Sequence, residues 1–91
     1  MDSTAARHRD TGERVKRVLV ETLDLGIDPA HLADDTSLYS PVIQMDSLNL
    51  LHLSVALEEE FDGVLNEEDL MQADLEDVGS VIRLVDAKLG R

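Results

Sequence analysis

Apolar residues in this chain recur at the three- to four-residue spacing of helices, and no segment alternates as a strand would. The first such stretch predicts a helix from Thr11 or Gly12 to Leu25, with Gly26 as its terminating residue. The residues before it, 1–10, are polar and lack periodicity, which predicts a flexible N-terminal tail followed by one domain over residues 11–91.

Three further helices are predicted downstream. The second covers residues 47–61, and Asp62 and Gly63 end it. A short third helix covers residues 67–72 with Asn66 as its cap, and a fourth covers residues 78–89. The predicted fold class is therefore all-α, a four-helix bundle of three longer helices and one short third helix.

A long first loop, residues 27–46, connects the first two helices. It holds two Xaa-Pro turns and is too apolar for a solvated linker. We expect it to lie across the core, held by five apolar side chains: Ile27, Leu32, Leu38, Val42 and Ile43. Loops of this length inside a compact domain are often functional.

The second predicted helix has two apolar faces. One face is an ordinary core stripe of Leu50, Leu53, Leu57 and Phe61. The other carries Leu48, Leu51 and Val55, rimmed by Ser47, His52, Glu58 and Glu59. An apolar centre with a charged rim is typical of a surface for a transient partner. The alternative is that Leu51 and Val55 pack beneath the long loop.

Composition and charge exclude several classes of function. Ninety-one residues suffice for one small core. The formal net charge of −12 repels nucleic acids and anionic membranes and favours basic protein surfaces. Cysteine is absent, which excludes disulfides and thiolate chemistry. With no membrane-spanning run, we expect a cytoplasmic protein. Nothing in the sequence indicates an oligomer, so a monomer is the default expectation.

Ser47, at the start of the second helix, is the candidate functional residue, because its hydroxyl could react or be modified. Either Asp46 or Ser47 fits the N-cap position, and a purely structural cap is one interpretation. The sequence does not favour the interpretation of Ser47 as a catalytic nucleophile. His52 is turned away from Ser47 on the helix, and no G-x-S-x-G motif is present. A third interpretation is covalent modification, since a helix N-terminus favours a phosphate ester.

The second helix resembles that of acyl carrier proteins and related phosphopantetheine-dependent carrier proteins. The residues that carry this resemblance are Asp46-Ser47-Leu48, Leu53 and Ala56-Leu57-Glu58-Glu59-Glu60-Phe61. The similarity extends to Leu25-Gly26-Ile27, Asp34-Asp35-Thr36-Ser37-Leu38, Asn66-Glu67-Glu68-Asp69-Leu70 and Val78-Gly79-Ser80-Val81, and so covers about residues 15–89.

The resemblance implies a carrier without catalysis of its own. It implies a 4′-phosphopantetheine arm on Ser47, installed from coenzyme A by a phosphopantetheinyl transferase, and a thioester-bound cargo. The implied partners are that transferase, an acyl-activating ligase or acyltransferase, and a ketosynthase or other condensing enzyme. The implied docking residues are Asp46, Leu48, Leu51, Val55, Glu58 and Glu59.

The resemblance does not decide which biosynthetic pathway the protein serves. Asn49 and His52 stand where fatty-acid carriers often have acids, which favours a stand-alone carrier of polyketide or related specialised biosynthesis over a fatty-acid one. An aminoacyl or peptidyl carrier shares these features. A non-modified acidic adaptor with a carrier-like fold, in which Ser47 is only a helix cap, is the alternative from another class.

Overall fold

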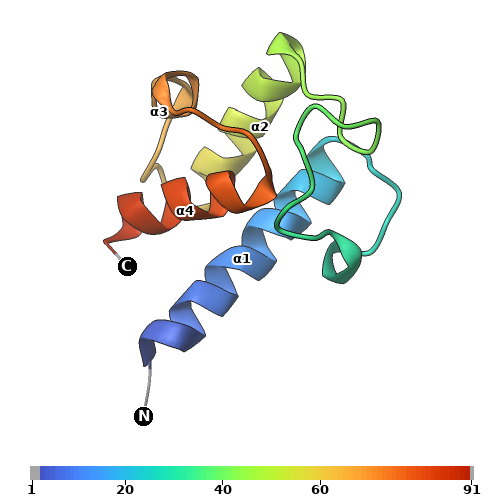
Figure 1. Cartoon of the computed structure of the whole chain (residues 1–91). Helices are drawn as coiled ribbons and strands as arrows, with labels where there is room; N and C mark the ends of the chain where they lie inside the picture. The colour runs from blue at the N-terminus through green and yellow to red at the C-terminus, as the bar shows by residue number, and fades with distance from the viewer. Residues whose placement is uncertain (1–2, 91) are drawn as a thin grey trace.

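The structure is a computed structural model that describes residues 3–90, with side chains described from Asp10 onward. Within those residues the chain forms four α-helices and no strand, which confirms the predicted all-α class (Figure 1). They are α1 (Ser3–Thr22), α2 (Ser47–Glu60), α3 (Glu67–Gln72) and α4 (Val78–Leu89), together with one 3-10 helix, η1 (Pro29–His31).

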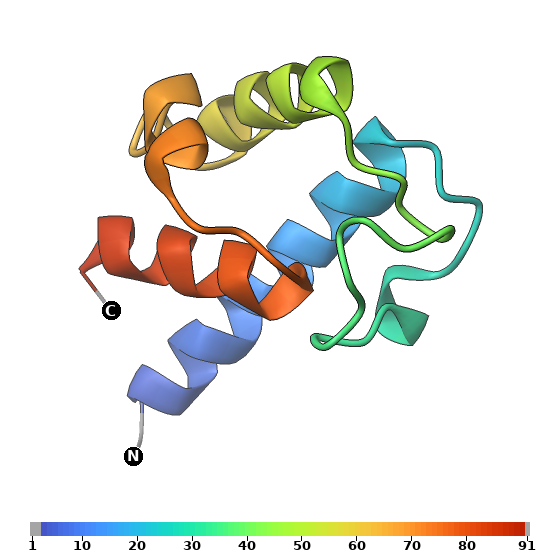
Figure 2. The same cartoon turned by 45° about the horizontal axis from the view of Figure 1, so that its top comes forward.

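The first helix is the element around which the others are arranged. It contacts α2, α4 and η1, while α3 packs against α2. Figures 1 and 2 show the N-terminal turns of α1 extending beyond the rest of the fold. The core contains mostly Leu and Val, contributed by the helices and by the long connection between α1 and α2. Burial of these side chains is the main stabilising contribution in so small a domain.

The predicted limits of the first helix were wrong at both ends. It begins at Ser3 rather than at Thr11 or Gly12, so most of the predicted flexible tail is helical, while Met1 and Asp2 lie outside the described residues. Two Ala and two Arg favour a helix there without a core-facing stripe to reveal it. The helix ends at Thr22, because Asp24 is left-handed (φ 52°) and the Leu25 N–H donates to the Val20 carbonyl.

The other helices begin and end close to the predicted residues. Helix α2 stops one residue early, at Glu60, and Asp62 follows in the left-handed conformation (φ 55°). The bounds of α3 and α4 are as predicted. Asn66 caps α3 and Asp77 caps α4, each in a reciprocal capping box.

The long connection is held against the core, but by fewer side chains than expected. Leu32, Leu38 and Ile43 are buried as predicted. The expectation was wrong for Ile27 and Val42, which are 36% and 50% exposed. Each of these two comes beside a turn-forming Pro or Gly, and the turn directs its side chain outward.

Backbone hydrogen bonds fix this connection to the start of α4. The Leu38 N–H donates to the Glu76 carbonyl at 2.9 Å, and the Val78 N–H donates to the Thr36 carbonyl at 3.0 Å. The Gly79 N–H donates to the Asp34 carbonyl at 2.7 Å, and a Cβ at Gly79 would lie 3.3 Å from that oxygen. The glycine therefore permits the close approach of the two segments.

None of the helices in the described part of the chain combines the length and the apolar character needed to cross a bilayer.

Candidate functional site

The N-terminus of α2 is fixed by the residue before it. The Met45 N–H donates to the Leu38 carbonyl at 2.8 Å. This bond ties the end of the connection to a residue of the same connection that is buried in the core. Asp46 is extended (φ −140°), and its Oδ1 accepts the Asn49 N–H at 2.7 Å. Asp46 is therefore the N-cap, and Ser47 is the first residue of the helix.

This assignment decides between two interpretations of Ser47. The interpretation of Ser47 as the helix cap was wrong, because Asp46 has this role. Ser47 is exposed, and no described residue forms a hydrogen bond with its Oγ. The hydroxyl is thus accessible to a modifying enzyme from outside the molecule.

The backbone around Ser47 suits a phosphate ester. Among residues 3–90 nothing accepts a hydrogen bond from the N–H groups of Ser47 and Leu48, since the cap takes only that of Asn49. Free N–H groups and the positive end of the helix dipole stabilise negative charge at this position. The residues present therefore fit a phosphate-linked group on the Ser47 side chain.

A left-handed residue turns the chain into this site. Gln44 has a φ of 53°, a conformation that costs a non-glycine residue about 1–2 kcal/mol. Its N–H donates to the Ser40 carbonyl at 2.8 Å, and its own carbonyl accepts the Asn49 side-chain amide at 3.5 Å. The turn lets Ile43 enter the core while Asp46 and Ser47 remain exposed.

The two faces of α2 differ in burial as the sequence indicated. Leu53, Leu57 and Phe61 are at most 3% exposed, and Leu50 is partly buried against the same core. On the opposite side Leu48, Leu51 and Val55 are 61%, 41% and 51% exposed. The alternative that Leu51 and Val55 pack beneath the loop was therefore wrong. A docking role for the exposed side chains stays a prediction.

The C-terminal end of α2 carries the acids. Glu58 and Glu59 are exposed. Glu60 forms ion pairs with α1, because its Oε2 accepts hydrogen bonds from Arg14 Nε at 2.7 Å and from Arg17 at 3.1 Å. Arg14 also donates to the Glu60 carbonyl at 2.6 Å and lies over the Phe61 ring, 4.4 Å from its centroid.

Two carboxyl groups have displaced pKa values. The hydrogen bond from Arg14, with the charges of Arg14 and Arg17, holds the pKa of Glu60 below its ordinary value despite partial burial. The hydrogen bonds from Lys88 and from the Asn66 N–H lower the pKa of Asp69 in the same way. Both are structural ion pairs between helices. No local pattern in the sequence indicated the pair of Arg14 and Glu60, since the two residues lie 46 positions apart.

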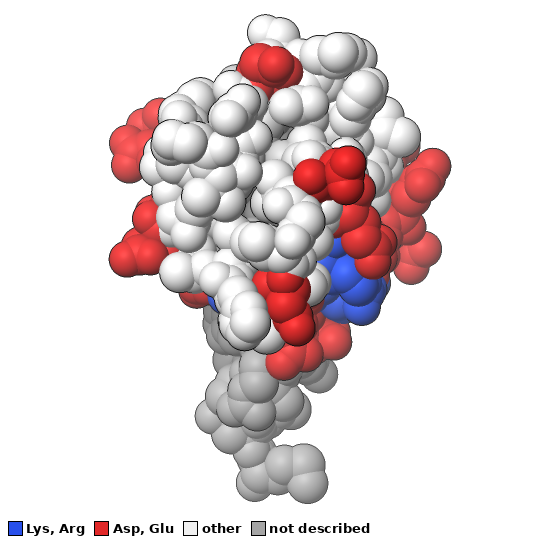
Figure 3. Space-filling model, turned by 90° about the vertical axis from the view of Figure 1, so that its right-hand side faces the viewer, with Lys and Arg blue, Asp and Glu red and all other residues white. Residues whose placement is uncertain are grey.

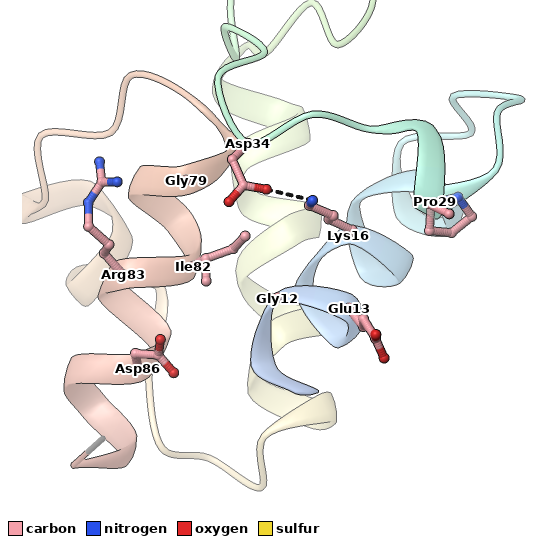
Figure 4. A pocket seen from close by; sticks show the side chains of 10 residues that line it. Gly12, Glu13, Lys16, Pro29, Asp34, Gly79, Ile82, Arg83 and Asp86 are labelled. Atoms are coloured by element: carbon pink, nitrogen blue, oxygen red, sulfur yellow. Dashed lines mark ion pairs between the residues drawn. The ribbon is translucent and has the colours of Figure 1, made fainter. Parts of the chain in front are cut away.

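One cavity in the described part of the molecule lies away from α2. It has a volume of about 650 Å³ and is bounded by α1, α4 and the segment around η1 (Figure 4). The ion pair between Lys16 and Asp34 crosses it, and Ile82 points into it. Its lining contains no serine, histidine or cysteine, and α2 contributes nothing to it.

No described residues form a cluster of His, Asp or Glu suited to a metal ion. The exposed His52 lies more than one helical turn beyond Ser47 and forms no hydrogen bond with it. The arrangement therefore presents an accessible hydroxyl without the base that a nucleophilic catalyst needs.

An exposed serine that is not the helix cap lies at the start of the second helix of this four-helix fold, where its hydroxyl is open to covalent attachment of a group. Comparison with known proteins agrees. The family model described as "Phosphopantetheine attachment site" matches residues 13–85. A protein named acyl carrier protein from Solidesulfovibrio magneticus is 33% identical over 78 residues, which cover 86% of this chain and 94% of that relative.

The chain belongs to the acyl carrier protein family, whose prosthetic group is covalently attached 4′-phosphopantetheine.

The assignment of Asp46 as the cap predicts that two adjacent substitutions change the stability by different amounts. Asp46→Ala removes the acceptor for the Asn49 N–H and should lower the free energy of unfolding by about 1 kcal/mol. Ser47→Ala removes no described hydrogen bond and should change it by less than about 0.5 kcal/mol. Urea unfolding monitored by circular dichroism measures both. A larger loss for Ser47→Ala than for Asp46→Ala would contradict the assignment.

The ion pair of Glu60 predicts a pH-dependent contribution to stability. Because its pKa is lower in the folded chain, the contribution is complete above the unfolded pKa of about 4.3 and disappears as the pH falls through the folded value. Glu60→Gln should therefore cost about 1 kcal/mol at pH 7 and progressively less below pH 4 or so.

Thermal unfolding across this pH range gives the comparison. Glu59→Gln is the matched control, because it removes the same charge from the neighbouring position and none of the described ion pairs. An equal effect of both substitutions at every pH would show that the contacts of Glu60 with α1 add nothing.

Proposed function

We propose that this chain is a stand-alone acyl carrier protein that holds acyl intermediates on a 4′-phosphopantetheine arm attached to Ser47. The observation that supports this most directly is the division of roles at the start of α2. Asp46 satisfies the helix, and the exposed Ser47 hydroxyl is left without a partner among the described residues.

In this proposal the attachment is a phosphoryl-group transfer. Ser47 Oγ attacks the phosphorus of coenzyme A that bears the pantetheine, and an O–P bond forms. The bond from that phosphorus to the bridging pyrophosphate oxygen breaks, and adenosine 3′,5′-bisphosphate leaves. A base of the transferase takes the hydroxyl proton, because no described residue of this chain is placed to do so. The attached group supplies the thiol that holds an acyl chain as a thioester.

The residues of the chain contribute position rather than catalysis. The free N–H groups of Ser47 and Leu48 would stabilise a phosphate on the Ser47 side chain, and α2 presents the exposed Leu48, Leu51 and Val55 on the same helix. A tether of this kind raises the effective concentration of its cargo at successive enzymes. Docking must be weak enough to reverse, which suits a small apolar strip flanked by Glu58 and Glu59.

We assign the cargo to polyketide or related specialised biosynthesis. The support is the small number of charges near the arm: Asp46 precedes Ser47, Asn49 and His52 follow it on α2, and the acids within the helix itself lie at its far end. An aminoacyl cargo is the alternative. The transferase, an acyl-activating enzyme and a condensing enzyme are the partners this role requires, and a cytoplasmic monomer remains the expectation from the sequence.

Intact-mass measurement tests the attachment. The purified apo-protein, incubated with coenzyme A, Mg²⁺ and a broad-specificity phosphopantetheinyl transferase, should gain the mass of one phosphopantetheine. Ser47→Ala should gain nothing. Ser37→Ala, which removes another exposed serine hydroxyl, should be modified like the wild type. Failure of the wild type to gain mass with any transferase would refute the proposal.

A further inference from the structure

The cavity between α1, α4 and the η1 segment has the size of a ligand site. Its volume of about 650 Å³ lies within the range of about 300–1,000 Å³ that is usual for small-molecule sites. Helix α4 forms one side and η1 the other, with α1 between them (Figure 4). Because α2 contributes none of the lining residues, a ligand held here would leave Ser47 exposed.

Gly12 leaves open space in the wall of this cavity. It lies within α1, where glycine is a less favourable helix former than alanine. A Cβ at this position would lie 3.7 Å from Ile82 Cδ1, which is an ordinary contact, so the packing of α1 near α4 does not require a glycine. The space beside Ile82, which points into the cavity (Figure 4), belongs to the cavity instead.

A buried carboxylate gives the cavity its preference for charge. Asp86 lines the cavity from α4 and is only 5% exposed. Glu13 adds a second carboxylate from α1. Where water is largely excluded, a carboxylate attracts a cation more strongly than it does at the surface. The acids of the lining therefore favour a positively charged ligand.

The two cations of the lining are paired with other acids. Lys16 pairs with Asp34, and Arg83 Nη2 lies 3.8 Å from Asp77 Oδ1. Figure 4 shows the Arg83 side chain extending away from Asp86. An anionic ligand would also have to approach a molecule with a net charge of −12, and Figure 3 shows acids far outnumbering bases on another face. The cavity therefore selects cations over anions.

The cation that suits this cavity is organic rather than a metal ion. The described residues contain no group of three or more His, Asp or Glu side chains that could hold a metal. Opposite Ile82, η1 contributes Pro29 and Ala30 to the lining. Small-molecule sites combine such apolar walls with a few polar groups that fix the orientation of the ligand.

We propose that this cavity is a second binding site, which takes an ammonium or guanidinium group carried on an aliphatic chain. The cationic end pairs with Asp86, and the chain packs against Ile82 in the space that Gly12 leaves. A free amine and the lysine or arginine side chain of another protein share this chemistry. The inference does not depend on the function proposed for Ser47.

The test is a titration of the 15N-labelled full chain with hexylamine at pH 7, followed through the backbone amide chemical shifts. The shifts should saturate with a Kd on the order of 1–10 mM. They should centre on the cavity, at Gly12, Lys16, Gly79 and Ile82. Hexanoate has the same number of carbon atoms and the opposite charge, and it should produce no saturating shift.

A second probe distinguishes the two sources of the cation. N-acetyl-lysinamide presents a lysine side chain with both backbone ends blocked, as in a protein. A Kd similar to that of hexylamine would assign the site to the side chain of a partner protein. Binding of hexylamine without binding of N-acetyl-lysinamide would assign it to a free amine.

Substitutions separate the cavity from the general attraction of cations to an acidic protein. Gly12→Leu fills the space beside Ile82 and Asp86→Asn removes the buried charge, so each should raise the Kd of hexylamine about tenfold or more. Gly12→Ala, for which the 3.7 Å contact leaves room, should raise it by a smaller factor. Circular dichroism verifies that each variant is folded.

Glu21→Gln is the matched control, because it removes an exposed acid of α1 that does not line the cavity. It should leave the Kd within about twofold of the wild-type value. Shifts centred on Glu58 and Glu59, equal affinity for hexanoate, or a wild-type Kd in both Gly12→Leu and Asp86→Asn would overturn the inference. None of these results bears on the modification of Ser47.

Discussion

Leu38 joins the three parts of the molecule that determine where Ser47 lies. Its side chain is buried in the core between the helices. Its N–H donates to the Glu76 carbonyl just before α4, and its carbonyl accepts the Met45 N–H just before α2. One residue thus ties the long connection to the beginnings of two helices. The position and direction of α2 depend on this attachment, because α2 otherwise meets the fold through its buried face and the Arg14 contacts at its other end.

In this proposal, carrier function requires a stable helix N-terminus and a serine hydroxyl at that terminus that forms no hydrogen bond. The chain meets these two requirements with adjacent residues. Asp46 closes the helix, Ser47 is exposed, and the left-handed Gln44 turns the backbone between the buried Ile43 and the exposed cap. Had the serine been the cap, modification of its oxygen would have competed with the hydrogen bond that begins the helix.

The fold was largely predictable because the core stripe of α2, the apolar spacing of the other helices and the cap Asn66 are local signals. The N-terminal half of α1 was missed because its sequence is polar and shows no apolar period. The outward direction of Val42 and Tyr39 was missed because a turn, rather than composition, decides which side chains of a loop enter the core. The Arg14–Glu60 pair joins residues distant in sequence, so no local pattern contained it.

The central claim is that Ser47, and not another serine, carries the prosthetic group, because among the serines of residues 10–90 it is the one whose side chain is exposed and forms no hydrogen bond. Ser54 is buried and donates to the Leu51 carbonyl, while Ser80 completes the cap of α4. Proteolysis of the modified wild-type protein followed by fragment-ion mass spectrometry locates the group directly. The account predicts phosphopantetheine on Ser47 alone. Its presence on any other serine, with Ser47 unmodified, would contradict the account.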